Sequence, residues 1–196
     1  MGRIKSALEI ALEKTENVKS DKATIGLFEA KQRGKLLANQ FLAGEISSLE
    51  AEFKKAPAEE QGSLKQGCFE VFLSQINLPS AGDDFKRLET LGNGLSVIIS
   101  TKHFAHLYSQ FLGAVSQFLK EAAQYDDAIK RQYAPRLHQK EEEIAKRIGR
   151  QVKIDPFQDP EFVTFYNQHM NALKSNYENL TGDVRNQITE MYRPEC

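Results

Sequence analysis

The chain has 196 residues, of which 40% are hydrophobic and 27% are charged, the composition of a folded globular protein with a charged surface. Lys and Arg number 26 against 27 Asp and Glu, so the net charge is −1 and gives no overall attraction to nucleic acid or anionic lipid. No run approaches the roughly 20 apolar residues of a membrane span, and no apolar signal-peptide segment follows the N-terminus. The two cysteines, Cys68 and Cys196, are too few for a disulfide framework, and we expect a cytoplasmic location.

The N-terminal half is predicted to be helical. Apolar residues at helical spacing cover residues 3–44, as either one helix or two. The first residues also match the short N-myristoylation pattern through Gly2 and Ser6, but this pattern is common by chance and we favour a plain helix start. A short helix is expected at about 45–55, and the next one begins near Pro57 and runs to about residue 77.

The run Leu91-Gly92-Asn93-Gly94 is the most turn-like segment inside a helical pattern. The residues that follow it are β-branched, so one interpretation is a small β-hairpin that pairs 95–100 with 68–73. We favour a break or distortion between two helices at this run.

From Leu95 onward the apolar residues follow the spacing of a coiled coil. A broad apolar face over 97–122 predicts burial against more than one partner. Beyond Tyr125 the face narrows to a stripe that can cover one helix only. This stripe consists of Ile129, Tyr133, Leu137, Ile144 and Ile148. Pro135 predicts a kink or the start of a new segment.

A second narrow apolar seam follows over about 159–192, beyond an expected helix end at Gly149. Two seams of matching width predict an antiparallel helical hairpin. If the numbers of facing residues have a constant sum, Ile144 pairs with Phe162 and Tyr133 with Leu173.

The predicted fold is therefore all-α, a helical bundle with a long coiled-coil-like hairpin formed by about 95–149 and 159–192. Residues 1–90 would be an N-terminal helical part that packs on the base of the hairpin, residues 91–196, within one folding unit. The end of the hairpin, near 140–160, is expected to project into solvent or to meet a second subunit.

Four histidines are the candidate metal ligands. His103 and His106 are three residues apart on a predicted helix, and His138 and His169 would lie at nearly the same height of the hairpin. For both pairs we favour structural or solvent-exposed side chains over a metal site, and no cofactor is expected.

Charged residues are concentrated near the end of the first hairpin helix. Glu142–Lys146 and Glu143–Arg147 have the spacing of stabilising helical ion pairs, which is the simpler reading of this pattern. The functional alternative is a basic surface that contacts phosphates or an acidic partner. Its candidate residues are Arg136, Lys140, Lys146, Arg147, Arg150 and Lys153.

Catalytic sequence patterns are missing. Gly92-Asn93-Gly94 lacks the third glycine of a dinucleotide-binding loop, and Arg33-Gly34-Lys35 lacks the rest of a phosphate-binding loop. We therefore expect a non-catalytic interaction or assembly protein, with another protein or a second copy as partner. The alternatives are a helical bundle that binds a small ligand or metal, whether or not it is an enzyme, and a basic hairpin end that binds nucleic-acid backbone.

Overall fold

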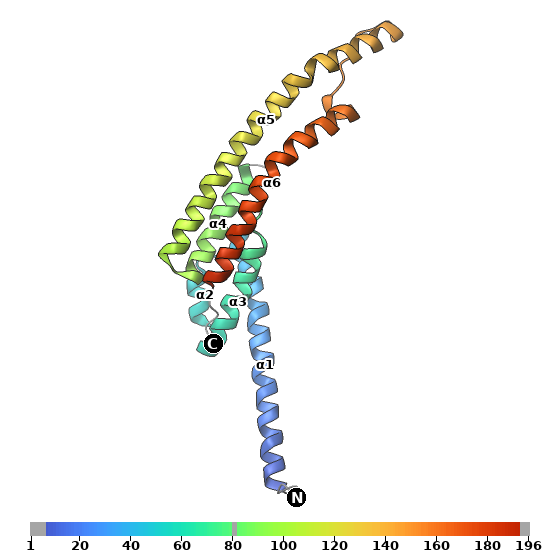
Figure 1. Cartoon of the computed structure of the whole chain (residues 1–196). Coiled ribbons are helices and arrows are strands. Elements are labelled where there is room, and N and C mark those ends of the chain that lie inside the picture. Colours follow the sequence, from blue (N-terminus) through green and yellow to red (C-terminus); the bar gives the residue numbers. More distant parts are fainter. Residues whose placement is uncertain (1–6, 80–81, 193–196) are drawn as a thin grey trace, which may run out of the picture. The chain divides into compact units, whose positions relative to one another are not determined.

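The computed structural model describes residues 7–79 and 82–192, and the side chains of 24–79 and 84–192 (Figure 1). The described residues form six α-helices and no strand. These are α1 (Ala7–Leu42), α2 (Leu49–Lys55), α3 (Ala58–Ser74), α4 (Gly82–Ile99), α5 (Lys102–Ile148) and α6 (Pro160–Met191), with one turn of 3-10 helix, η1 (Pro156–Gln158). The all-α prediction is confirmed, as is the antiparallel packing of α5 on α6. The pattern at Gly2 and Ser6, and Cys196, lie outside the described residues.

The chain divides into two compact units. The first comprises Met1–Ile76, Glu89–Ala105 and Ile188–Cys196, and the second comprises Asn77–Leu88 and His106–Gln187. No helix among the described residues has the length and apolar character needed to cross a membrane.

In the first unit, α1 and α3 approach each other unusually closely. Ala30 and Ala38 on α1 have no exposed surface, and Gly34 lies between them. A Cβ atom on Gly34 would lie 2.1 Å from the carbonyl oxygen of Leu64, and one on Gly67 would lie 2.1 Å from that of Lys31. The two glycines therefore allow the helix backbones to touch, which explains why glycines stand in the middle of helical segments.

The glycine-rich run at 91–94 also lies inside a helix. The predicted break there was wrong, because α4 continues through it to Ile99, and Ser100, with a φ of 46°, precedes α5. A Cβ atom on Gly94 would lie 2.8 Å from the Phe72 ring, so this glycine makes room for an aromatic side chain rather than for a turn. The β-hairpin reading is excluded too, since 68–73 lies in α3 and 95–99 in α4.

The structure answers two further questions that the sequence left open. Residues 7–42 form one helix, and Gly44, with a φ of 78°, follows its end. No new segment begins at Pro135, because α5 continues through it without interruption (Figure 1).

In the second unit, the broad face of α5 contacts two helices, as expected. The Tyr108 hydroxyl donates a hydrogen bond of 2.8 Å to the carbonyl oxygen of Leu88 on α4. Ten residues further along α5, the Phe118 ring packs against Tyr177 of α6, with ring centroids 5.1 Å apart. Beyond Phe118 the described partner of α5 is α6 and then the connection that precedes it.

Candidate interaction site at the hairpin tip

The contacts between α5 and α6 determine which part of α5 remains uncovered. Tyr133 lies against Phe162, with ring centroids 5.2 Å apart, and both side chains are buried. Ile129 and Met170 complete this buried cluster. The predicted pairing of Ile144 with Phe162 was therefore wrong: Phe162 faces a residue about three turns nearer to the start of α5.

The connection between the helices explains this difference. Residues 149–155 are irregular, and an extended residue advances about 3.3 Å against about 1.5 Å in a helix. The chain therefore runs back along α5 for about twice the length that the same number of helical residues would cover. The backbone N–H of Ile154 donates a hydrogen bond of 2.8 Å to Glu141, which attaches the connection to α5.

A buried carboxylate anchors the start of α6. Asp159 is 6% exposed, and its side chain caps the helix by accepting a hydrogen bond of 3.1 Å from the backbone N–H of Glu161. The Lys140 ammonium donates to both Asp159 oxygens, at 3.0 and 2.8 Å, and to Glu161 at 2.8 Å. The Tyr133 hydroxyl donates to Asp159 at 3.0 Å. We call these four residues the Asp159 cluster.

The electrostatics of the Asp159 cluster indicate a structural role. The hydrogen bond from Lys140 holds the pKa of Asp159 below its usual value, and the hydrogen bonds to Asp159 and Glu161 raise the pKa of Lys140. Burial raises the pKa of Tyr133, and the neighbouring carboxylate adds to this effect. Asp159, Lys140 and Tyr133 are thus stabilised in their ordinary ionisation states at neutral pH, and all four residues already have partners within the hairpin.

Beyond the Asp159 cluster the apolar stripe of α5 continues without a helix to cover it. Ile144 is 38% exposed and Ile148 is 50% exposed, whereas Tyr133 is 2% exposed. Both isoleucines lie on the stripe that α6 covers further down. We define the hairpin tip as residues 136–160, and its exposed apolar pair as Ile144 and Ile148.

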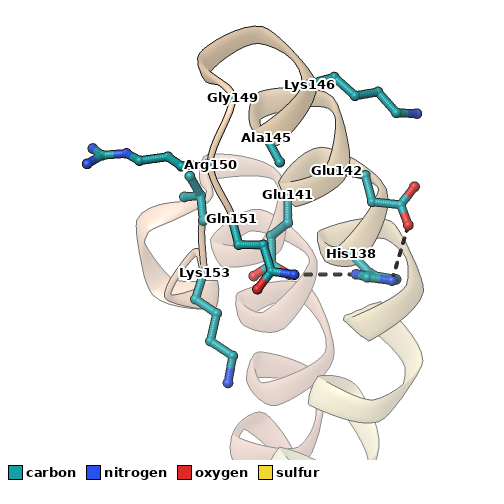
Figure 2. Close-up of a pocket in the computed structure, with 10 residues that line it drawn as sticks. His138, Glu141, Glu142, Ala145, Lys146, Gly149, Arg150, Gln151 and Lys153 are labelled. Carbon is teal, nitrogen blue, oxygen red and sulfur yellow. Dashed lines mark ion pairs between the residues drawn. The ribbon is translucent and has the colours of Figure 1, made fainter.

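A groove of about 1080 Å³ lies between the last turns of α5 and residues 149–153 of the connection. His138 contacts Glu142 at 3.3 Å and Glu141 at 3.8 Å on one side of it (Figure 2). The side chains of Lys146, Arg150 and Lys153 also line the groove, but Figure 2 shows that they point in three different directions. They do not converge on one anion-binding position.

The candidate basic residues therefore separate into different environments. Lys140 is held in the Asp159 cluster, and the Arg136 guanidinium lies 6.0 Å from the centroid of the Tyr133 ring. Arg147 is exposed on α5. The predicted Glu142–Lys146 and Glu143–Arg147 ion pairs are not formed among the described residues, and Glu142 contacts His138 instead.

The candidate histidines are not brought together as predicted. His138 lies beyond Tyr133 toward the tip, whereas His169 packs on Phe165 at 4.5 Å and follows the residues that face Tyr133. Their predicted common height was wrong because it depended on the wrong register. His103 and His106 are both exposed on α5. In the part of the chain that the structure describes, no three His, Cys, Asp or Glu side chains gather in a metal-binding arrangement.

Sequence reasoning missed Asp159 and Glu161 as partners of Lys140. The only signal was Asp159-Pro160, which is typical of a helix start and was interpreted as such. Their contact with a lysine 19 residues earlier depends on the path of the connection, which no local pattern specifies.

Together these features define an all-α protein with a two-helix arm whose end is closed by a charged cluster and carries an exposed apolar pair. Residues 50–190 match DUF6657, a family of unknown function, and the chain belongs to this family. The match contains the whole of α5 and the connection, whereas α1 precedes it. No curated protein and no solved structure matches the chain.

Proposed function

We propose that this chain is a non-catalytic interaction protein that binds a protein partner through its hairpin tip. The observation that carries the proposal is the exposure of Ile144 and Ile148 on the same stripe that is buried against α6 further down. Single exposed apolar side chains are common on protein surfaces. Two on successive turns, in line with a helix-packing seam, form the kind of surface that a partner helix covers.

The polar groups at the tip support binding of a protein rather than chemistry. Among the described side chains, no buried nitrogen or oxygen lacks a hydrogen-bond partner, so no buried polar group there needs a ligand to complete its hydrogen bonds. The Asp159 cluster is satisfied within the hairpin. The basic residues of the groove diverge, which gives the phosphate-binding alternative no convergent set of donors.

The family match is consistent with this location. It spans the tip, so the arm is part of the region by which the family is defined.

Site-specific photocrosslinking in the native cell tests the proposal. A photoreactive amino acid at Ile148 is expected to give a covalent adduct with a protein, and the adduct is expected to disappear when Ile144 is changed to Asp. The matched control is the same photoreactive residue at Gln132, which is also exposed on α5 but lies outside the tip. Absence of any protein adduct at position 148, or equal adducts at both positions, would overturn the proposed function.

A further inference from the structure

We infer that the partner of the hairpin tip is a second copy of this chain, related to the first by a twofold axis that sets the two α5 ends antiparallel. This inference rests on the proposed function and adds the identity of the partner and the orientation of the contact. Twofold contacts between identical chains use the same surface on both copies, so the surface must be complementary to itself.

The order of charges along the tip provides this complementarity. The acidic residues Glu141, Glu142 and Glu143 directly precede Ile144, and the basic residues Lys146, Arg147 and Arg150 surround Ile148. Antiparallel pairing therefore places the acidic segment of each copy beside the basic segment of the other, with the isoleucines between them. Parallel pairing would place like charges together, which is unfavourable across an interface.

One pair of residues makes the arrangement specific. Glu143 and Arg147 are exposed, lie four residues apart, and each directly precedes one of the two isoleucines. They therefore form a line beside Ile144 and Ile148 on the same helix. No ion pair joins them within the described chain, and Glu143 of one copy can pair with Arg147 of the other. The twofold axis produces this ion pair twice.

Two neighbouring charged residues already have partners within the hairpin. Lys140 donates to Asp159 and Glu161, and Glu141 accepts from the backbone of Ile154. Two exposed isoleucines from each copy and two ion pairs make a small contact. We expect a concentration-dependent dimer with a dissociation constant on the order of 1–100 µM rather than a permanent one.

Charge-reversal substitutions in the purified full chain test the inference. The dimer dissociation constant is measured by sedimentation equilibrium, and circular dichroism checks the helix content of each variant. Glu143→Lys and Arg147→Glu are each expected to weaken the dimer about 10-fold or more, because each places like charges opposite each other. The double variant recreates the ion pair with its signs exchanged, and its dissociation constant is expected to return to within about 3-fold of the unmodified chain.

A matched control comes from α6, where Lys174 and Glu178 are also exposed and four residues apart. Exchanging these two charges is expected to leave the dimer unchanged. The inference is overturned if the unmodified chain stays monomeric throughout the concentration range, if the single changes have no effect, or if the double variant is no better than the single ones.

The two proposals fail in different ways. A monomeric chain whose position 148 still crosslinks to a different protein in the cell refutes the second copy and leaves the interaction function standing. A chain that forms no adduct at position 148 in the cell refutes the interaction function, and a chain that is also monomeric in sedimentation equilibrium refutes the dimer as well. An adduct of twice the mass of the chain, lost in Arg147→Glu and regained in the double variant, supports both.

Discussion

Tyr133 and Phe162 meet edge to face, with ring planes at 66° and centroids 5.2 Å apart. This contact sets the first turn of α6 against the segment of α5 that ends just before Pro135. The last turns of α5 consequently receive only the irregular connection as a cover. The exposure of the apolar pair at the tip is a direct result of where these two rings meet.

Truncation of Phe162 and of Ile144 should have very different effects on stability. Phe162 has no exposed surface, so Phe162→Ala is expected to reduce the free energy of unfolding by about 3–5 kcal/mol. Ile144 is 38% exposed, so Ile144→Ala should cost less than about 1 kcal/mol. Urea denaturation followed by circular dichroism measures both. Similar losses would contradict the exposure of Ile144 and indicate that it is buried, as the register predicted from the sequence required.

The helical seams were predictable because they depend on spacing within the chain. The apolar stripes on α5 and α6, the helix end near Gly149 and the start near Asp159 are all local signals. The register is different in kind, since it depends on how far the irregular residues 149–155 travel. The misplaced contacts between α5 and α6, including the supposed His138–His169 pair, followed from that one unknown distance.

Gly94 shows a second limit of local reasoning. Two glycines around an asparagine are typical of a turn, and the sequence contains nothing that marks them as buried. In the structure the ring of Phe72, a residue of α3, occupies the space next to Gly94 that a Cβ atom would need. Gly67 is equally hard to interpret from the sequence. It lowers the helix propensity of α3, and its close contact with the backbone of α1 offsets this loss.

Removal of the Asp159 carboxylate should loosen the start of α6. Asp159→Ala deletes a helix cap and two charge-assisted hydrogen bonds from Lys140, and the loss of the cap alone is worth about 1–2 kcal/mol. Hydrogen exchange is expected to increase at the first turns of α6. Asp155→Ala is the matched control, because Asp155 caps only the single turn η1. Equal exchange in the two variants would contradict a special role for Asp159.

The same carboxylate should make stability depend on pH in the acidic range. Because the hydrogen bond from Lys140 lowers the pKa of Asp159 in the folded chain, the carboxylate stabilises the fold above the unfolded value of about 3.9. This contribution is lost as the pH falls below that value and through the lower folded pKa. Urea unfolding between pH 2 and 6 should therefore show a steeper acid loss in the unmodified chain than in Asp159→Ala. Parallel pH profiles would show that another carboxylate is responsible.

Substitution of Gly34 should reverse the usual effect of replacing a helix glycine by alanine. At Gly26 of the same helix no atom lies within 4 Å of an added Cβ, so Gly26→Ala should stabilise the chain by about 0.5–1 kcal/mol. At Gly34 the added atom meets the Leu64 carbonyl oxygen at 2.1 Å, and the helices must separate. Gly34→Ala is expected to destabilise the chain by about 1–3 kcal/mol despite its better propensity. Thermal denaturation of the two variants compares them, and stabilisation of both would show that α1 and α3 do not touch.

The reactivity of Cys68 gives an independent test of the same helix contact. Its thiol is fully buried and donates a hydrogen bond of 3.0 Å to the Gly34 carbonyl oxygen, and burial raises its pKa to about 12. At pH 8 the thiolate fraction is then about three orders of magnitude below that of a free cysteine. In a Cys196→Ser background, where Cys68 is the remaining thiol, labelling with a thiol-exchange reagent should be correspondingly slow and should become fast in denaturant.

Gly34→Ala should raise the native labelling rate, because separating α1 from α3 exposes the sulfur, whereas Gly26→Ala should leave the rate unchanged. Fast labelling of Cys68 in the chain whose only change is Cys196→Ser would mean that the α1–α3 contact opens readily in solution.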